Sequence, residues 1–299
     1  MSYRLVEPQL PPQRSRFRMF SRRSVAVLPT LFTLGNLLCG FTAVFIASRA
    51  DDVDMPFQWT PLTFAAILIL IGLVLDGLDG TIARLIRSES NLGEQLDSLA
   101  DMVTFGVAPA FMVMQLVGIG APWLGMSAKA DTLFDRVALA IAGIYVVCAG
   151  LRLARFNIET GENEARSFKG LPTPGAAGTV ASLALLHQHF LARYPEQHWS
   201  VGLAAYFMVF VTLMVAITMV SQFRYPHLAN RYMRGRAPFA RILGAMMVGL
   251  LLVIHPRWGL AVGFSLYAIL TPLTGAYHWV MGHSAIVDED DSPDSCVAG

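Results

Sequence analysis

Long runs of residues without charge constrain this chain more than any other feature of its sequence. Between Ser24 and Ser48 no residue is charged, and the run is long enough to cross a hydrocarbon core, which needs about 20 helical residues. Similar runs recur along the chain, in which 55% of the 299 residues are hydrophobic and only 14% are charged. The sequence therefore predicts a membrane protein, for which the bilayer is the relevant solvent.

The apolar runs predict an all-α fold, a polytopic membrane helical bundle. Eight helices are expected, at 24–48, 60–86, 96–120, 135–157, 172–192, 200–222, 239–255 and 258–281. The first six form a core domain over 24–222. The last two form a C-terminal pair of transmembrane helices within 223–283, separated only by His255, Pro256 and Arg257.

The distribution of Lys and Arg predicts the orientation of the bundle. Of the 22 basic residues, 17 lie in 1–23, 84–94, 152–171 and 224–241, and only 5 lie in the alternate segments. Because basic residues concentrate on the cytoplasmic side of a membrane, both termini are expected in the cytoplasm. The protein is expected in the cytoplasmic (inner) membrane.

The two ends of the chain have distinct compositions. In 1–23, arginines alternate with apolar residues, which suits a segment lying on an anionic leaflet but equally suits a simple positive flank. The last residues, 284–299, are rich in Asp and are expected to form an acidic disordered tail.

Four carboxylates lie at the cytoplasmic ends of the second and third expected helices. Asp76 and Asp79 are three residues apart, and Asp97 and Asp101 are four apart, so each pair shares one face of its helix. The short connection makes the helices antiparallel neighbours, which brings the pairs together. Gly80 leaves space beside the first pair for a ligand or a helix.

Acidic side chains are costly beside a membrane span, and four of them repel one another unless a cation lies between them. Carboxylate oxygens suit hard divalent ions, and no His or Cys occurs at these positions, which disfavours zinc. We expect a divalent metal, Mg²⁺ or Mn²⁺, with two ions bridged as in phosphoryl-transfer sites. The alternative is that the acids pair with Arg84, Arg87 or solvent.

Eight residues in this region resemble, in type and spacing, the complete signature of the CDP-alcohol phosphatidyltransferase family. They are Asp76, Asp79, Gly80, Ala83, Arg84, Gly93, Asp97 and Asp101. No position departs from the signature, and eight fixed positions within 26 residues seldom agree by accident. The signature identifies the class of reaction better than the acceptor alcohol.

The resemblance implies a membrane enzyme with a six-helix catalytic core that binds a CDP-linked lipid and forms a homodimer. It implies these metal ligands: Asp76, Asp79, Asp97 and Asp101. The resemblance also implies that Asp101 is the general base. Gly80 and Arg84 match positions associated with the nucleotide and its phosphates, where a glycine permits close approach and an arginine offers a planar fork.

Three other segments resemble the membrane-integral phosphatidylserine synthase branch of the family. They are LPTLFTLGNLLCGF at 28–41, RLARFN at 152–157 and FKGLPTP at 168–174. The resemblance implies a metal-assisted transfer of the phosphatidyl group of CDP-diacylglycerol to L-serine, with release of CMP. No separate covalent nucleophile is apparent in the sequence, which favours direct displacement. Asn36 is then expected at the nucleotide site. The residues expected to hold the lipid phosphate or the serine carboxylate are Arg152, Arg155 and Lys169.

Other interpretations of these residues stay open at the level of sequence. Arg152 and Arg155 can instead extend to the lipid headgroups. The acceptor can be glycerol 3-phosphate, inositol phosphate or choline. An ion-coupled transporter also carries intramembrane acids, although these lie near mid-membrane rather than at one end. No nucleic-acid partner is expected.

Overall fold

The computed structural model describes residues 27–49, 59–86, 91–120, 128–159, 170–193, 198–221 and 254–280. Within these ranges the chain forms helices and no strand, which confirms the all-α prediction. The helices are α2 (Val27–Ala47), α3 (Pro61–Ile86), α4 (Asn91–Asp101), the π-helix η2 (Met102–Val107), α5 (Ala108–Gly120), α6 (Ala128–Glu159), α7 (Thr173–Arg193), α8 (His198–Val220) and α11 (Pro256–Val280). The terminal segments expected at 1–23 and 284–299 lie outside the described residues.

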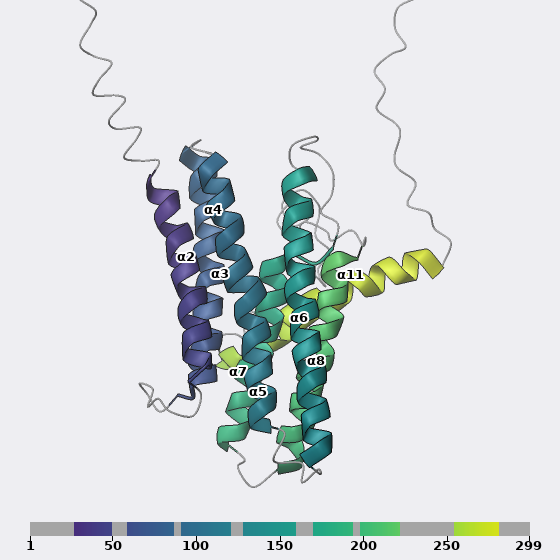
Figure 1. Cartoon of the computed structure of the whole chain (residues 1–299). Coiled ribbons are helices and arrows are strands. Elements are labelled where there is room, and N and C mark those ends of the chain that lie inside the picture. The colour runs from purple at the N-terminus through teal and green to yellow at the C-terminus, as the bar shows by residue number, and fades with distance from the viewer. Residues whose placement is uncertain are drawn as a thin grey trace, which may run out of the picture.

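Five of the described segments are long and apolar enough to cross a membrane. They are Thr30–Ala47 in α2, Pro61–Ile82 in α3, Leu92–Gly118 in α4 to α5, Leu133–Ile158 in α6 and Gly202–Val220 in α8. These helices stand together as an upright bundle (Figure 1). They agree with five of the expected spans to within a few residues, and the fold is that of a polytopic helical membrane protein.

The bundle has a packed interior and an apolar outer surface. Phe105, Tyr145 and Met112 are completely buried between helices. Large apolar side chains such as Leu38 and Phe41 on α2 are more than half exposed. Outward-facing apolar side chains are expected where the solvent is lipid, because the hydrocarbon does not penalise their exposure.

The two helices that carry the acids run in opposite directions. α3 ends at Ile86 and α4 begins at Asn91, so the chain reverses within a few residues. In Figure 1 both helices lie beside α2, which packs against each of them. The acid-bearing parts of α3 and α4 therefore meet toward one end of the bundle.

The third span contains a π-helical segment directly after Asp101. η2 is closed by the N–H of Ala108, which donates to the carbonyl of Val103, five residues earlier. Pro109 gives a physical reason, because proline has no N–H to donate to the carbonyl of Phe105. Tyr145 of α6 supplies the missing donor, with its hydroxyl 3.0 Å from the Phe105 oxygen.

The expected span at 172–192 is present as α7, but it is not among the five apolar segments. α7 packs against α3, α5, α8 and α11. Its buried positions hold small or polar residues, including Thr179, Ser182 and Gln188. A helix enclosed by other helices contacts little lipid, so small residues that allow close packing replace large apolar ones.

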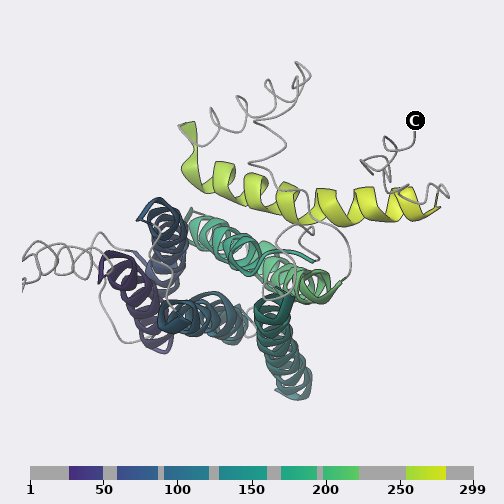
Figure 2. The ribbon, with the colours of Figure 1, turned by 90° about the horizontal axis from the view of Figure 1, so that it is seen from above.

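The C-terminal pair is only partly described. Residues 239–253, most of the first expected helix, lie outside the described ranges. The second corresponds to α11, which the view from above shows lengthwise while the bundle helices appear nearly end-on (Figure 2). α11 therefore crosses the bundle instead of extending it by another upright span.

The packing of α11 on α7 accounts for this crossing. A Cβ atom on Gly178 would lie 2.3 Å from Cε1 of Phe264, and one on Gly175 would lie 2.7 Å from Cε1 of Tyr267. Only residues without a side chain leave room for the two rings. A hydrogen bond also joins the two helices, in which the Thr179 hydroxyl of α7 donates to the backbone carbonyl of Phe264 in α11 at 3.3 Å.

Candidate functional site

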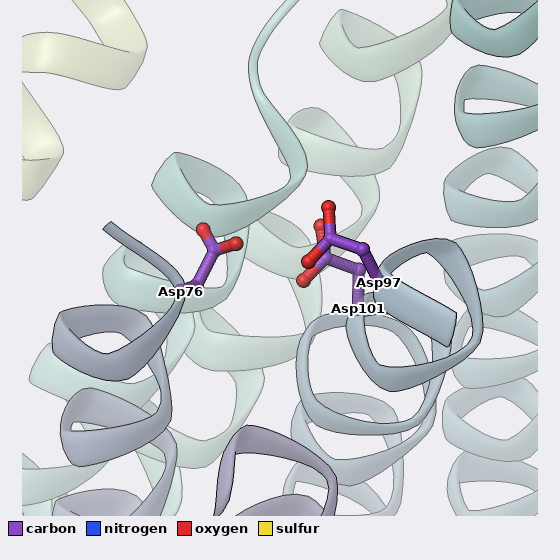
Figure 3. Close-up of side chains that lie close together, drawn as sticks. All are labelled: Asp76, Asp97 and Asp101. Carbon is purple, nitrogen blue, oxygen red and sulfur yellow. The ribbon is translucent and has the colours of Figure 1, made fainter. Parts of the chain in front are cut away.

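Three of the four predicted carboxylates converge. One oxygen from each of Asp76, Asp97 and Asp101 lies within 4.8 Å of the other two. Asp97 and Asp101 project from α4 toward Asp76 on α3 (Figure 3). The spacings of three and four residues, together with the reversal between the helices, thus produce the expected meeting of acids.

The donor set fits a hard divalent cation. The group supplies carboxylate oxygens from two facing helices, and it contains neither His nor Cys. Asp101 is only 8% exposed, so solvent does little to screen the charges of the cluster. A positive ion among these oxygens would offset their mutual repulsion, and Mg²⁺ and Mn²⁺ prefer oxygen ligands.

Asp79 lies outside this trio, although the resemblance implied it as a metal ligand. Its carboxylate accepts a hydrogen bond from the hydroxyl of Thr33 on α2, and the side chain is buried. Asp79 remains within electrostatic range of Asp97. Asp79 therefore belongs to the same charged region as the trio, but its described hydrogen-bond donor is the Thr33 hydroxyl.

Asn36 is placed next to Asp101. Its Nδ2 donates to Oδ1 of Asp101 at 3.2 Å, and the Asn36 side chain is completely buried. The resemblance implied a nucleotide-binding role for Asn36. In the structure the described partner of its amide is the carboxylate of the expected base.

The two sequence segments expected at the acceptor site meet in space. Nη1 of Arg152, from RLARFN, donates to the hydroxyl of Thr173, from FKGLPTP, at 2.7 Å. Arg152 is also within electrostatic range of Asp101. Arg155 is half-buried on the same helix, and Lys169 lies outside the described residues.

The nucleotide-site residues on α3 are less completely described. Gly80 is exposed, and a Cβ built on it would have no atom within 4 Å, so open space adjoins this position. Arg84 belongs to α3, but its side chain lies outside the described part of the chain.

Sequence analysis missed several polar residues that hold the site together. Thr33 contacts Asp79, and Asn157 donates through Nδ2 to the Ser98 hydroxyl at 3.0 Å, which ties α6 to α4. Thr33 and Asn36 are three residues apart on an uncharged helix. This pair of polar residues on one face of an apolar helix was a usable signal for the contact of Thr33, but not for that of Asn157.

Known proteins resemble this chain over about two thirds of its length. The family model for CDP-alcohol phosphatidyltransferase matches residues 26–221. The CDP-diacylglycerol–serine O-phosphatidyltransferase of Helicobacter pylori is 34% identical over 203 residues, covering 67% of this chain and 72% of that protein. The enzyme of the same name in Bacillus subtilis is 28% identical and is covered over 90% of its length, with 67% of this chain aligned. The archaetidylserine synthase of Methanothermobacter thermautotrophicus is 30% identical, with 68% of this chain and 71% of that protein covered. α11 lies beyond the matched residues.

Proposed function

This chain belongs to the CDP-alcohol phosphatidyltransferase family, and from that premise we propose that it transfers the phosphatidyl group of CDP-diacylglycerol to L-serine, forming phosphatidylserine and releasing CMP. The observation that carries the proposal is the convergence of Asp76, Asp97 and Asp101 between α3 and α4. Relatives named for the serine reaction or for archaetidylserine synthesis support serine as the acceptor.

The proposed cofactor is Mg²⁺ or Mn²⁺, bound as two ions by Asp76, Asp79, Asp97 and Asp101. When bound, the ions would neutralise the pyrophosphate of the CDP-lipid and stabilise the charge that develops on CMP. The cluster of carboxylate oxygens supports this proposal for the trio. For Asp79, its position within electrostatic range of Asp97 supports a role in the same charged region.

Asp101 is the proposed general base. It accepts the proton of the serine hydroxyl while the serine oxygen forms a bond to the phosphatidyl phosphorus. The bond between that phosphorus and the oxygen of CMP breaks, and CMP leaves with the electron pair. Direct displacement needs no covalent enzyme intermediate. The burial of Asp101 next to Asp76 and Asp97, where the pyrophosphate would lie, supports its role as the base.

Arg152, Arg155 and Lys169 are the proposed contacts to the lipid phosphate or the serine carboxylate. Arg152 is favoured most directly, because its hydrogen bond to Thr173 holds the guanidinium within electrostatic range of Asp101. A planar guanidinium binds carboxylate and phosphate groups through paired N–H donors. Gly80 and Arg84 are proposed at the nucleotide, where open space adjoins Gly80.

The proposed location is the inner membrane, with both termini and the active site on the cytoplasmic side, and the proposed assembly is a homodimer. The excess of Lys and Arg in alternate segments supports the orientation. A site at the cytoplasmic end would give serine and CMP access to water while the acyl chains stay in the bilayer.

The deciding experiment supplies purified protein, in detergent or lipid, with CDP-diacylglycerol and L-serine. CMP and phosphatidylserine are measured with Mg²⁺, with Mn²⁺ and with neither. CMP and phosphatidylserine are expected in equal amounts, and only when Mg²⁺ or Mn²⁺ is present. Release of CMP with glycerol 3-phosphate, inositol phosphate or choline but not with serine would keep the reaction class and overturn the acceptor. Absence of CMP with every alcohol would reject the transferase function.

A further inference from the structure

The whole side chain of Asn36 is buried beside a carboxylate. Nδ2 donates to Asp101, while Oδ1 is buried and accepts no hydrogen bond from the described residues. A buried amide oxygen without a donor destabilises a fold. The hydrogen bond from Nδ2 to Asp101 is the described contact that offsets this cost.

The surroundings of Asn36 fix the direction of its amide. A Cβ atom on Gly72 of α3 would lie 2.8 Å from Oδ1, so the backbone of α3 closes that side. The hydroxyl of Thr104 in η2 donates to the backbone carbonyl of Asn36 at 2.8 Å, which ties the backbone of Asn36 to η2. The backbone of Asn36 is therefore tied to η2, while its side chain lies against α3 and donates from Nδ2 to Asp101.

Thr104 fits into a notch between α2 and α3. A Cβ atom on Gly40 would lie 2.3 Å from Oγ1 of Thr104, and one on Gly72 would lie 2.6 Å from its Cγ2. Both glycines thus bring the backbones of α2 and α3 against η2 at the turn that follows Asp101. The helices α2, α3 and η2 therefore approach one another closely at Thr104.

The π-helix links this close packing at Thr104 to the orientation of Asp101. A π-turn changes the direction of side chains relative to a regular α-helix, and such turns are common at functional sites. Asp101 directly precedes η2, and Tyr145 holds the far side of η2 through the Phe105 carbonyl. The orientation of the Asp101 carboxylate therefore depends on contacts made by η2 on both sides.

We propose that Asn36 is a positioning residue, which together with Thr104 orients the Asp101 carboxylate toward Asp76 and Asp97, and that it does not bind the nucleotide. The inference rests on the proposed function, in which Asp101 accepts the proton of serine. An orienting hydrogen bond to a charged base acts on the chemical step, whereas a nucleotide contact acts on the binding of the CDP-lipid.

The test compares Asn36→Ala and Asn36→Asp with the wild type and with Thr42→Val. Asn36→Asp keeps the size of the side chain but replaces the donor with a second carboxylate facing Asp101. Thr42 is a half-buried residue of α2 that lies outside the site, so its variant controls for changes in that helix. For each protein, kcat, the KM for CDP-diacylglycerol and the Kd of CDP with Mn²⁺ are measured.

Asn36→Ala is expected to lower kcat by about 10- to 100-fold, the effect of losing one hydrogen bond to a charged group. The KM for CDP-diacylglycerol and the Kd of CDP are expected to stay within about threefold of the wild type. Asn36→Asp should lower kcat further because of repulsion, and Thr42→Val should match the wild type. A rise in KM and Kd with kcat unchanged would overturn the inference and assign Asn36 to the nucleotide.

CDP binding also shows whether each variant is folded. If Asn36→Ala fails to bind CDP and elutes as aggregate, Thr104→Val replaces it, since this variant keeps the Asn36 amide but removes the hydroxyl that anchors its backbone. A smaller fall in kcat with unchanged CDP affinity supports the inference, and wild-type kcat contradicts it. If the wild type releases no CMP with any alcohol, the proposed function fails instead.

Discussion

The guanidinium of Arg152 on α6 donates a 2.7 Å hydrogen bond to the hydroxyl of Thr173, the first residue of α7. The two residues lie twenty-one positions apart, in segments that the family resemblance associates with the lipid phosphate or the serine carboxylate. The hydrogen bond also places a fixed cation within electrostatic range of Asp101. The arginine is thus held by the fold before any substrate binds.

Removing the hydroxyl of Thr173 should weaken substrate binding through Arg152. In Thr173→Val the guanidinium loses its described acceptor, and we expect about a tenfold rise in KM for either serine or CDP-diacylglycerol, with kcat nearly unchanged. Thr173→Ser keeps the hydroxyl and should behave as the wild type. Steady-state kinetics with each substrate varied in turn would show which of the two Arg152 holds. If neither KM changes in Thr173→Val, this role of Arg152 is wrong.

The proposed base and a proposed metal ligand should be separable by mutation. Asp101→Asn should reduce turnover by at least about a thousandfold, because the amide cannot accept the proton. It should keep more of the metal-dependent CDP binding than Asp76→Asn, in which a carboxylate needed by the cation is lost. Calorimetry with CDP and Mn²⁺, beside a CMP-release assay, measures both. Wild-type turnover in Asp101→Asn would exclude it as the base.

Removal of divalent metal should abolish activity reversibly. After chelation, the cluster of Asp76, Asp97 and Asp101 would lack the cation that offsets its charge. We expect Mg²⁺ or Mn²⁺ to restore CMP release and Ca²⁺ to restore much less, because its larger radius favours more ligands at longer distances. Full activity in excess chelator would contradict the metal proposal.

Tyr145 should contribute to stability through its bond to the π-helix. Tyr145→Phe removes the donor to the Phe105 carbonyl, which Pro109 cannot replace. The expected loss is about 1–3 kcal/mol, because the buried carbonyl loses its described side-chain donor. Thermal unfolding of the purified protein in detergent measures the loss. Thr42→Val, which also deletes one hydroxyl, is the control and should unfold near the wild-type temperature.

The packing of the Phe264 ring against Gly178 of α7 should make the stability of the protein sensitive to one added methyl group. A Cβ atom on Gly178 would overlap the ring, so Gly178→Ala should lower the unfolding temperature of the protein. Gly143→Ala on α6 is the matched control, since nothing lies within 4 Å of its Cβ position. Adding Phe264→Ala to Gly178→Ala should remove the clash, so the effects of the two substitutions should not be additive. Additive effects would mean that the Phe264 ring does not pack against Gly178.

Helical periodicity was sufficient to predict the convergence of Asp76, Asp97 and Asp101. Residues three or four apart share a face whatever the rest of the fold does, and a short connection leaves two helices few arrangements. The contact between Thr33 and Asp79 was not predicted in this way. It depends on which face α2 turns toward α3, and that is decided by tertiary packing.

The C-terminal region shows the same limit. Length and hydropathy of 258–281 favour a membrane span, and they carry no information about the direction of the helix axis. The crossing of α11 depends on the match between two glycines of α7 and two aromatic rings of α11. Such a match relates residues far apart in sequence and has no local periodic signature.

The contacts of α2 have a consequence for how the protein is made. Thr33 and Asn36, which donate to Asp79 and Asp101, precede both acids in the chain. Synthesis starts at the N-terminus, so α2 emerges from the ribosome before α3 and α4. Each carboxylate is therefore synthesised after its hydrogen-bond donor, so a partner on α2 exists from the time that α3 and α4 are made, beside a membrane where an unpaired charge is costly.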